Sequence, residues 1–184
     1  MNANASRVML RALRADDAPA MFAYRSDPEV GRYQSWEPAV LEDVRSFIKG
    51  LARTEPFTPG TWYQLGIALA STGELIGDCG VHIPAAEPRS AEFGITLAGA
   101  AQGRGLAAES LRALLAILFG TLGSHRVFCS VDPRNARSVA LMRRSGFRQE
   151  AHHRESLWFK GAWADDLVFA MLRSEWVTAN SRGA

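Results

Sequence analysis

The chain has 184 residues, of which 47% are hydrophobic and 22% charged, with a formal net charge of +2 at pH 7. These values are typical of a globular protein, and the length predicts one domain that buries about two-thirds of its unfolded surface. The small net charge argues against a nucleic-acid binder, and the absence of any apolar run of about 20 residues or of a signal-peptide core argues against membrane insertion and export.

The first half of the chain alternates strand and helix patterns. In chain order we expect a strand at 8–13, a helix capped by Asp16 or Asp17, an irregular loop at 28–38, a helix at 39–53, and strands at 62–69, 75–83 and 91–97. The helices are predicted from apolar spacing and capping residues, and the strands from apolar runs between turns. The aromatic segment at 28–38 is more typical of a binding loop than of a core element.

The second half continues with a helix pattern that ends at a glycine. Here we expect a helix at 106–119, a strand at 126–131, a helix at 136–145, a short stretch at 147–149, and a hairpin of 154–159 with 164–172 that turns at Lys160-Gly161. This order predicts a single α/β (α+β) domain. Cys79 and Cys129 are expected to be reduced, buried thiols of a cytoplasmic protein.

The loop at 102–107 is the most informative motif. Gly103 and Gly105 let the backbone approach a ligand, and the loop opens directly into a helix whose N–H groups have no partners. Such a helix N-terminus binds anions, and Arg104 adds a cation on the same turn. We therefore predict a phosphate site.

Two nucleotide-binding motifs do not fit this loop. A Walker loop requires a lysine followed by serine or threonine, and no lysine lies near it. A dinucleotide fingerprint requires a third glycine, and Ala108 stands in its place.

The motif Gln102-x-x-Gly105-x-Ala107 resembles the pyrophosphate loop of the GNAT acetyltransferases. Downstream, the segment from Asn135 to Phe147 is similar to the helix of that superfamily that begins with asparagine and ends in Gly-Phe. The segments 10–17, 26–30 and 36–38, and the hairpin 157–166, resemble its RimJ/RimL-type ribosomal-protein acetyltransferase branch. The resemblance covers residues 7–176, so it implies one domain over 7–176, with 1–6 and 177–184 as flexible termini.

This resemblance implies the GNAT fold: a mixed, mostly antiparallel twisted sheet flanked by helices, with two splayed strands that bind acetyl-CoA. The donor is then acetyl-CoA, held at its pyrophosphate by the backbone of 102–107. The residues implied in donor binding are Phe93, Ile95, Leu97, Gln102, Gly103, Arg104, Gly105, Leu106, Ala107, Asn135 and Ser138. The resemblance also implies that the strand at 91–97 separates from the strand at 126–131, and that its main chain near Phe93–Leu97 contacts the donor.

Acyl transfer to an amine requires a base, and Glu92 is our candidate. An α-amine with a pKa of about 7.7–8.0 is partly neutral at physiological pH, so a modest base is sufficient. On an alternating strand, Glu92, Gly94 and Thr96 point to one face and Phe93, Ile95 and Leu97 to the other. The alternative for Glu92 is a solvated or ion-paired strand carboxylate.

Two residues near 135 are candidates for contact with the thioester end. Asn135 lies where the family has a donor-contacting asparagine, and it is also suited to cap the following helix. Ser138 is our candidate to protonate the departing thiolate, with an ordinary helix serine as the alternative. Many members of the superfamily use a tyrosine as this acid, and Met142 stands there in this chain, so either Ser138 or solvent replaces it.

The acceptor site is expected to be aromatic and acidic. Its candidate side chains are Tyr33, Trp36, Tyr63 and Trp158, although core packing is the simpler explanation for most of them. The carboxylates of Glu37, Glu92, Asp165 and Asp166 are those expected to attract a cationic acceptor. His152-His153 lacks a third ligand, so we predict no metal.

The resulting hypothesis is an N-acetyltransferase that acts on the N-terminal α-amine of a protein or peptide, as a monomer or homodimer without nucleic-acid or membrane partners. A second hypothesis is a small-amine acetyltransferase acting on an aminoglycoside or polyamine. A third is a non-catalytic acyl-CoA-binding regulatory domain, which the missing tyrosine suggests.

Overall fold

A computed structural model describes residues 7–181, and within them one sheet of seven strands runs in the order β1-β2-β3-β4-β5-β7-β6. The strands are β1 (Val8–Ala12), β2 (Trp62–Leu69), β3 (Leu75–His82), β4 (Ser90–Leu97), β5 (Arg126–Val131), β6 (Arg148–Phe159) and β7 (Ala162–Leu172). All neighbouring pairs are antiparallel except β4 and β5, which are parallel. The expected mixed, mostly antiparallel sheet is confirmed.

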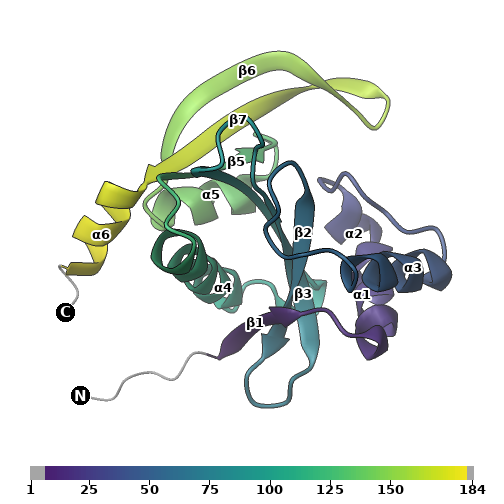
Figure 1. Ribbon diagram of the computed structural model, residues 1–184. Coiled ribbons are helices and arrows are strands. Elements are labelled where there is room, and N and C mark those ends of the chain that lie inside the picture. Colours follow the sequence, from purple (N-terminus) through teal and green to yellow (C-terminus); the bar gives the residue numbers. More distant parts are fainter. Residues whose placement is uncertain (1–6, 182–184) are drawn as a thin grey trace.

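Helices cover both faces of the sheet (Figure 1). The helices are α1 (Ala18–Arg25), α2 (Pro28–Gly31), α3 (Leu41–Leu51), α4 (Leu106–Leu115), α5 (Ala136–Arg144) and α6 (Arg173–Ser181). On one face α4 and α5 close the larger core, in which Phe119, Phe169 and Leu111 are fully buried. On the other face α1, α2 and α3 form a second core around Met21 and Val44.

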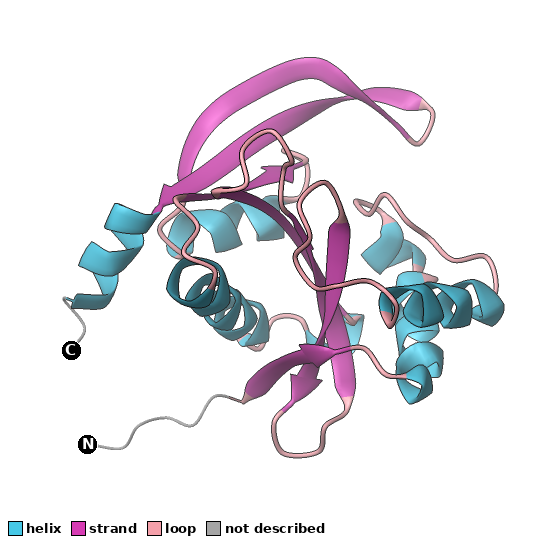
Figure 2. Cartoon of the chain, in the orientation of Figure 1, coloured by secondary structure: helices cyan, strands magenta, loops and turns pink. Residues whose placement is uncertain are grey.

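The hairpin of β6 and β7 bends away from the rest of the sheet and arches over it (Figure 2). Most of β6 is exposed, because this strand lies at the edge of the sheet. The strand begins at Arg148, whereas the sequence pattern indicated a break before 154. Since the residues of β6 are polar on both faces, no alternation marks the strand, and only its pairing with β7 defines it.

Three other segments differ from expectation. The first half of the loop expected at 28–38 contains α2, which Pro28 begins and the Asp27 side chain caps. The helix expected to end at Gly120 changes after Leu115 into a π-helix, Ala116–Thr121, whose wider turns place the adjacent Leu118 and Phe119 both in the core. Residues 177–181, expected in a flexible terminus, form the second half of α6. Residues 1–6 and 182–184 lie outside the described residues.

Candidate functional site

The two parallel strands β4 and β5 separate after a short ladder. Their pairing runs from Ser90↔Arg126 to Glu92↔Phe128 and ends there. On the other side of β4, the Ala98 N–H donates to the Ile76 carbonyl of β3. In an antiparallel pair, every second residue hydrogen-bonds to the neighbouring strand, and the residues between them direct their N–H and C=O groups to the opposite side. The N–H and C=O groups of Phe93, Ile95 and Leu97 therefore point toward β5, beyond the end of its ladder. The splayed arrangement is the one expected.

The loop before α4 has the backbone geometry that its glycines predict. Gly103 has φ +74° and Gly105, the N-cap of α4, has φ +80°. L side chains rarely adopt this left-handed conformation, and glycine adopts it without strain. The N–H groups of the first turn of α4 have no acceptor within the helix. The loop and the helix start thus have the backbone geometry on which the prediction of an anion site depends.

Side chains from other elements hold this loop in place. The Gln102 amide donates to the Leu97 carbonyl at 3.0 Å and accepts from the Arg137 guanidinium at 3.0 Å. Arg7 donates to the Arg104 carbonyl at 3.0 Å, whereas the Arg104 side chain itself is exposed. The side chain of Gln102 is thus occupied by protein contacts. The main chain of the loop and the Arg104 guanidinium are the groups that face solvent.

The start of α5 lies beyond the C-terminal end of β5. The side-chain Oδ1 of Asn135 accepts the Ser138 N–H at 3.2 Å, so Asn135 caps the helix as predicted. Met142 is buried, and its sulfur lies 3.3 Å from the Cys129 thiol. Burial, with smaller contributions from the charges of Glu92 and Asp166, raises the pKa of Cys129 to about 12. Neither sulfur residue can supply or accept a proton at neutral pH.

Glu92 lies at the point where β4 and β5 separate. It is paired in register with His82 on β3, and its side chain is 29% exposed. Register places Glu92 on the same sheet face as Thr96 and opposite to the buried Phe93. The same face carries Asp166, which accepts a hydrogen bond from the Ser130 hydroxyl on β5. Two carboxylates therefore lie on this face of the sheet, Glu92 at the vertex of the splayed strands and Asp166 farther along β7.

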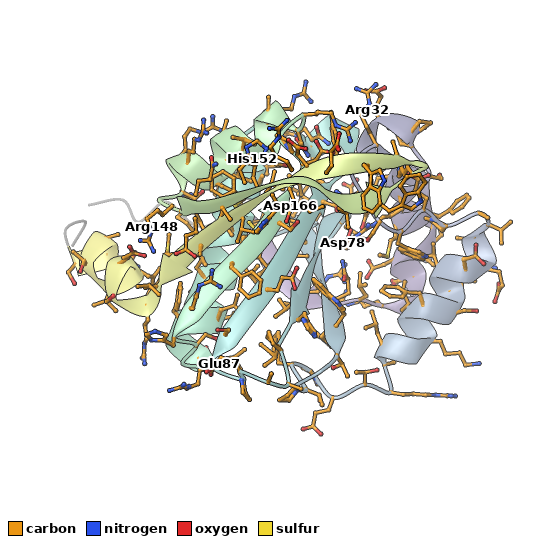
Figure 3. All side chains as sticks on the ribbon, turned by 90° about the horizontal axis from the view of Figure 1, so that it is seen from above. Arg32, Asp78, Glu87, Arg148, His152 and Asp166 are labelled. Atoms are coloured by element: carbon orange, nitrogen blue, oxygen red, sulfur yellow. The ribbon has the colours of Figure 1, made fainter. Side chains whose placement is uncertain are left out.

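A buried polar network beneath this face was not predicted from the sequence. The Asp78 side chain is 0% exposed and forms an ion pair with Arg25 of α1. It also accepts from the Tyr24 hydroxyl at 2.8 Å and from the Gln64 amide. Burial, together with the Asp78 charge, raises the pKa of Tyr24 above its usual value, which keeps the phenol a neutral donor. Figure 3 labels Asp78 and Asp166, which come from strands on opposite sides of the splayed pair.

A cavity of about 380 Å³ opens between α2, the start of α5 and the turn of the β6–β7 hairpin. It is lined by Arg32, Tyr33, Arg134, Phe159, Lys160 and Ala162. The Tyr33 hydroxyl donates to the Arg134 carbonyl at 3.2 Å, and Lys160 pairs with Glu37 and donates to the Gly31 carbonyl at 2.7 Å. The hairpin turn is thereby joined to the segment that follows α2.

The structure does not bring the other aromatic candidates together. Trp36 packs on Phe47 with ring centroids 4.8 Å apart, under the Arg25 guanidinium. Tyr63 is 7% exposed and belongs to the core on the α4–α5 side of the sheet. Trp158 is 62% exposed on the hairpin. Of the candidates, only Tyr33 lines the cavity.

Two of the four carboxylates expected at the acceptor site are paired within the fold: Glu37 with Lys160, and Asp165 with His152. The His152 imidazole contacts the Asp165 carboxylate at 2.7 Å, and hydrogen bonds from the Glu155 main chain and from His152 lower the pKa of Asp165.

Within residues 7–181, no group of histidine, cysteine and acidic side chains is arranged to hold a metal ion. In the same part of the chain, no helix is long and apolar enough to cross a membrane.

Comparison with protein families gives a match to the acetyltransferase (GNAT) domain over residues 7–148. Among curated relatives, the uncharacterized N-acetyltransferase YoaA of Bacillus subtilis is 30% identical and covers 91% of this chain and 94% of its own length. The alanine N-acetyltransferase of ribosomal protein uS5 from Escherichia coli is 33% identical over 75 residues, which are 41% of this chain and 39% of that protein.

Solved structures give the same fold. A GNAT-family acetyltransferase from Bacillus anthracis superposes with a TM-score of 0.81 at 23% identity, covering 95% of this chain and 99% of that one. Spermidine N-acetyltransferase from Vibrio cholerae, solved with CoA and spermine, superposes with a TM-score of 0.80 at 23% identity, covering 94% and 99%. These likenesses establish the arrangement of the sheet and helices described above.

Proposed function

Since the chain belongs to the GNAT family of acetyltransferases, which use acetyl-CoA, we propose that its acceptor is the N-terminal α-amine of a protein or peptide. The lining of the cavity beside α2 is the observation that favours a peptide acceptor over a polyamine acceptor. Arg32, Arg134 and Lys160 line that cavity, each paired with a carboxylate (Glu29, Asp132 and Glu37), and no acidic side chain is among its lining residues to hold a polycation. A peptide brings a single amine at its end together with backbone carbonyls that these side chains can bind.

Donor binding is assigned to the main chain in this proposal. The first turn of α4 and the loop from Gly103 to Gly105 hold the pyrophosphate, with Arg104 as a counter-charge. The N–H and C=O groups of Phe93, Ile95 and Leu97 hold the pantetheine arm by strand-like pairing. Leu106 and Ala107 contribute N–H groups, and the Asn135 amide nitrogen remains available, because its oxygen caps α5. Such a donor site fits a cytoplasmic enzyme.

The proposed chemistry is direct attack of the amine on the thioester. Glu92 removes the ammonium proton, and the nitrogen lone pair forms a bond to the carbonyl carbon. A main-chain N–H of β4 stabilises the negative oxygen, and collapse of the tetrahedral intermediate expels the thiolate while the nitrogen releases its second proton to solvent. The position of Glu92 at the vertex of the splay supports its role, because the acyl group of a donor lying between β4 and β5 points there.

Ser138 is proposed to protonate the departing thiolate. Its N–H is used by the Asn135 cap, and its hydroxyl lies at the start of α5 without a hydrogen-bond partner in the described chain. We expect Ser138→Ala to lower kcat about tenfold, less than a typical general acid, because a thiol with a pKa of about 8.5 is already a good leaving group. Thiol release at saturating donor measures the effect. An unchanged kcat would assign this step to solvent.

The acceptor class is tested with a panel of amines. We expect thiol release with peptides that have an unblocked N-terminus, and at least about tenfold lower kcat/KM with spermidine or an aminoglycoside, in keeping with a cavity lining that has no acidic side chain. The same peptides with acetylated N-termini are the control and should not react. Faster turnover of spermidine than of every peptide would contradict the proposal.

The small-amine alternative has one observation in its favour. Glu92 and Asp166 lie on the same face of the sheet, and neither carboxylate is paired with a lysine or arginine in the described chain. A relative from Vibrio cholerae named spermidine N(1)-acetyltransferase is 32% identical over 89 residues. The panel above separates this alternative from the peptide acceptor.

A further inference from the structure

His82 is a second titratable side chain at the vertex, and no step of the proposed chemistry uses it. It is the last residue of β3, directly opposite Glu92 on β4. Its ring stacks on Trp62 of β2, with centroids 5.3 Å apart and an interplanar angle of 20°. The strand register and the stacked ring together fix where its nitrogen atoms point.

The Nδ1 atom of His82 is buried and has no hydrogen-bond partner among the described residues. It lies 3.6 Å from Oε2 of Glu92, just beyond hydrogen-bonding distance. Buried polar atoms in folded proteins are nearly always paired, and an exception requires an explanation. The Glu92 carboxylate is the acceptor that the imidazole faces, and a small rotation of either side chain completes the bond.

We propose that His82 positions Glu92, by donating a hydrogen bond from Nδ1–H to Oε2 when the acceptor is bound. The other carboxylate oxygen is thereby turned toward the acceptor amine and takes its proton, while the imidazole keeps its own. The Nδ1–H tautomer is required because a carboxylate oxygen can only accept. This inference rests on the proposed role of Glu92 as the base.

Two substitutions separate this role from simple packing. His82→Phe keeps a ring on Trp62 and removes the donor, whereas His82→Asn loses the ring and keeps an N–H near the position of Nδ1. We expect His82→Phe to lower kcat about tenfold with an unchanged KM for acetyl-CoA, as for other groups that orient a reactive side chain. His82→Asn should stay within about twofold of the wild type.

The opposite order, with the asparagine variant impaired and the phenylalanine variant normal, would show that stacking is what matters and overturn the proposal. Equal activity in both variants would also overturn it. His82→Gln, whose amide falls nearer the Nε2 position, should behave like His82→Phe and replaces it if that variant does not fold. Thermal unfolding checks the fold of each variant.

A Glu92→Gln background distinguishes failure of this inference from failure of the proposed base. If His82 acts through Glu92, adding His82→Phe to Glu92→Gln lowers kcat no further. An independent tenfold loss in both backgrounds would overturn the positioning role and leave the base in place. If Glu92→Gln alone leaves kcat unchanged, the base assignment fails, and the role of His82 fails with it.

Discussion

Replacing Glu92 with glutamine is expected to lower kcat about 100-fold at pH 6.5, while leaving the affinity for CoA unchanged. The factor is at the lower end of what a general base contributes, because the acceptor amine is partly neutral near its own pKa. The loss should shrink as the pH rises through about 8, where a growing fraction of α-amine needs no base. Thiol release measured at saturating donor and acceptor across this pH range provides the test.

A matched substitution controls for the loss of a carboxylate as such. Glu87→Gln makes the same chemical change in the connection before β4, where the side chain is exposed and pairs with Arg89. This variant should keep full activity at every pH. A Glu92→Gln enzyme with the same kcat as the Glu87→Gln enzyme at pH 6.5 would rule out Glu92 as the base.

Arg25→Leu is expected to destabilise the fold by about 3–5 kcal/mol, because it leaves the Asp78 carboxylate buried without its counter-charge. Tyr24 and Gln64 still donate to that carboxylate, but neither carries a positive charge. For a chain of this size the change corresponds to a fall in Tm of about 10 °C. Denaturant unfolding and thermal unfolding of the purified protein measure the two quantities.

The control for this prediction is an exposed ion pair. Arg45→Leu removes the partner of Glu42 on the surface of α3 and should change the free energy of unfolding by less than about 1 kcal/mol. Combining Arg25→Met with Asp78→Asn removes both buried charges and should recover a large part of the lost stability. Equal, small effects of Arg25→Leu and Arg45→Leu would show that the buried pair does not stabilise the fold.

The Asp78 network also connects stability with the site. Arg25 and Tyr24 belong to α1, and Asp78 belongs to β3, in register with Thr96 of β4. The Thr96 hydroxyl in turn donates to the Gln34 side chain at 2.9 Å, just beyond α2. These contacts hold the helices of the acceptor side against the face on which Glu92 lies. Loss of the network is therefore expected to weaken acceptor binding as well as the fold.

Local sequence patterns were sufficient for most of the elements of the proposed donor site. The apolar stripe of α4 and the glycines before it predicted both the helix and the left-handed loop, because each depends on residues close together in the chain. The strand alternation around Glu92 was predicted for the same reason and places the carboxylate on the correct face. The family resemblance supplied the identity of the donor.

Sequence patterns did not predict the structure correctly where an element depends on residues that are distant in the chain. The polar strand β6 shows no alternation, and only pairing with β7 reveals it. Tyr63 reads as an exposed aromatic at the start of a strand, but the α4–α5 side of the sheet buries it. Two of the four carboxylates expected at the acceptor site are also paired by contacts across the fold, since Lys160 pairs with Glu37 and His152 with Asp165.

By itself, then, the sequence determined the elements of the proposed donor site. A glycine loop, a helix start and an alternating strand are local features that short segments encode. Only the tertiary structure decided which side chains meet at the vertex. His82 and Glu92 are ten positions apart, and Arg25 and Asp78 are 53 apart, so strand register and helix docking bring each pair together. No periodicity within one segment reports such contacts, because they depend on how separate elements pack.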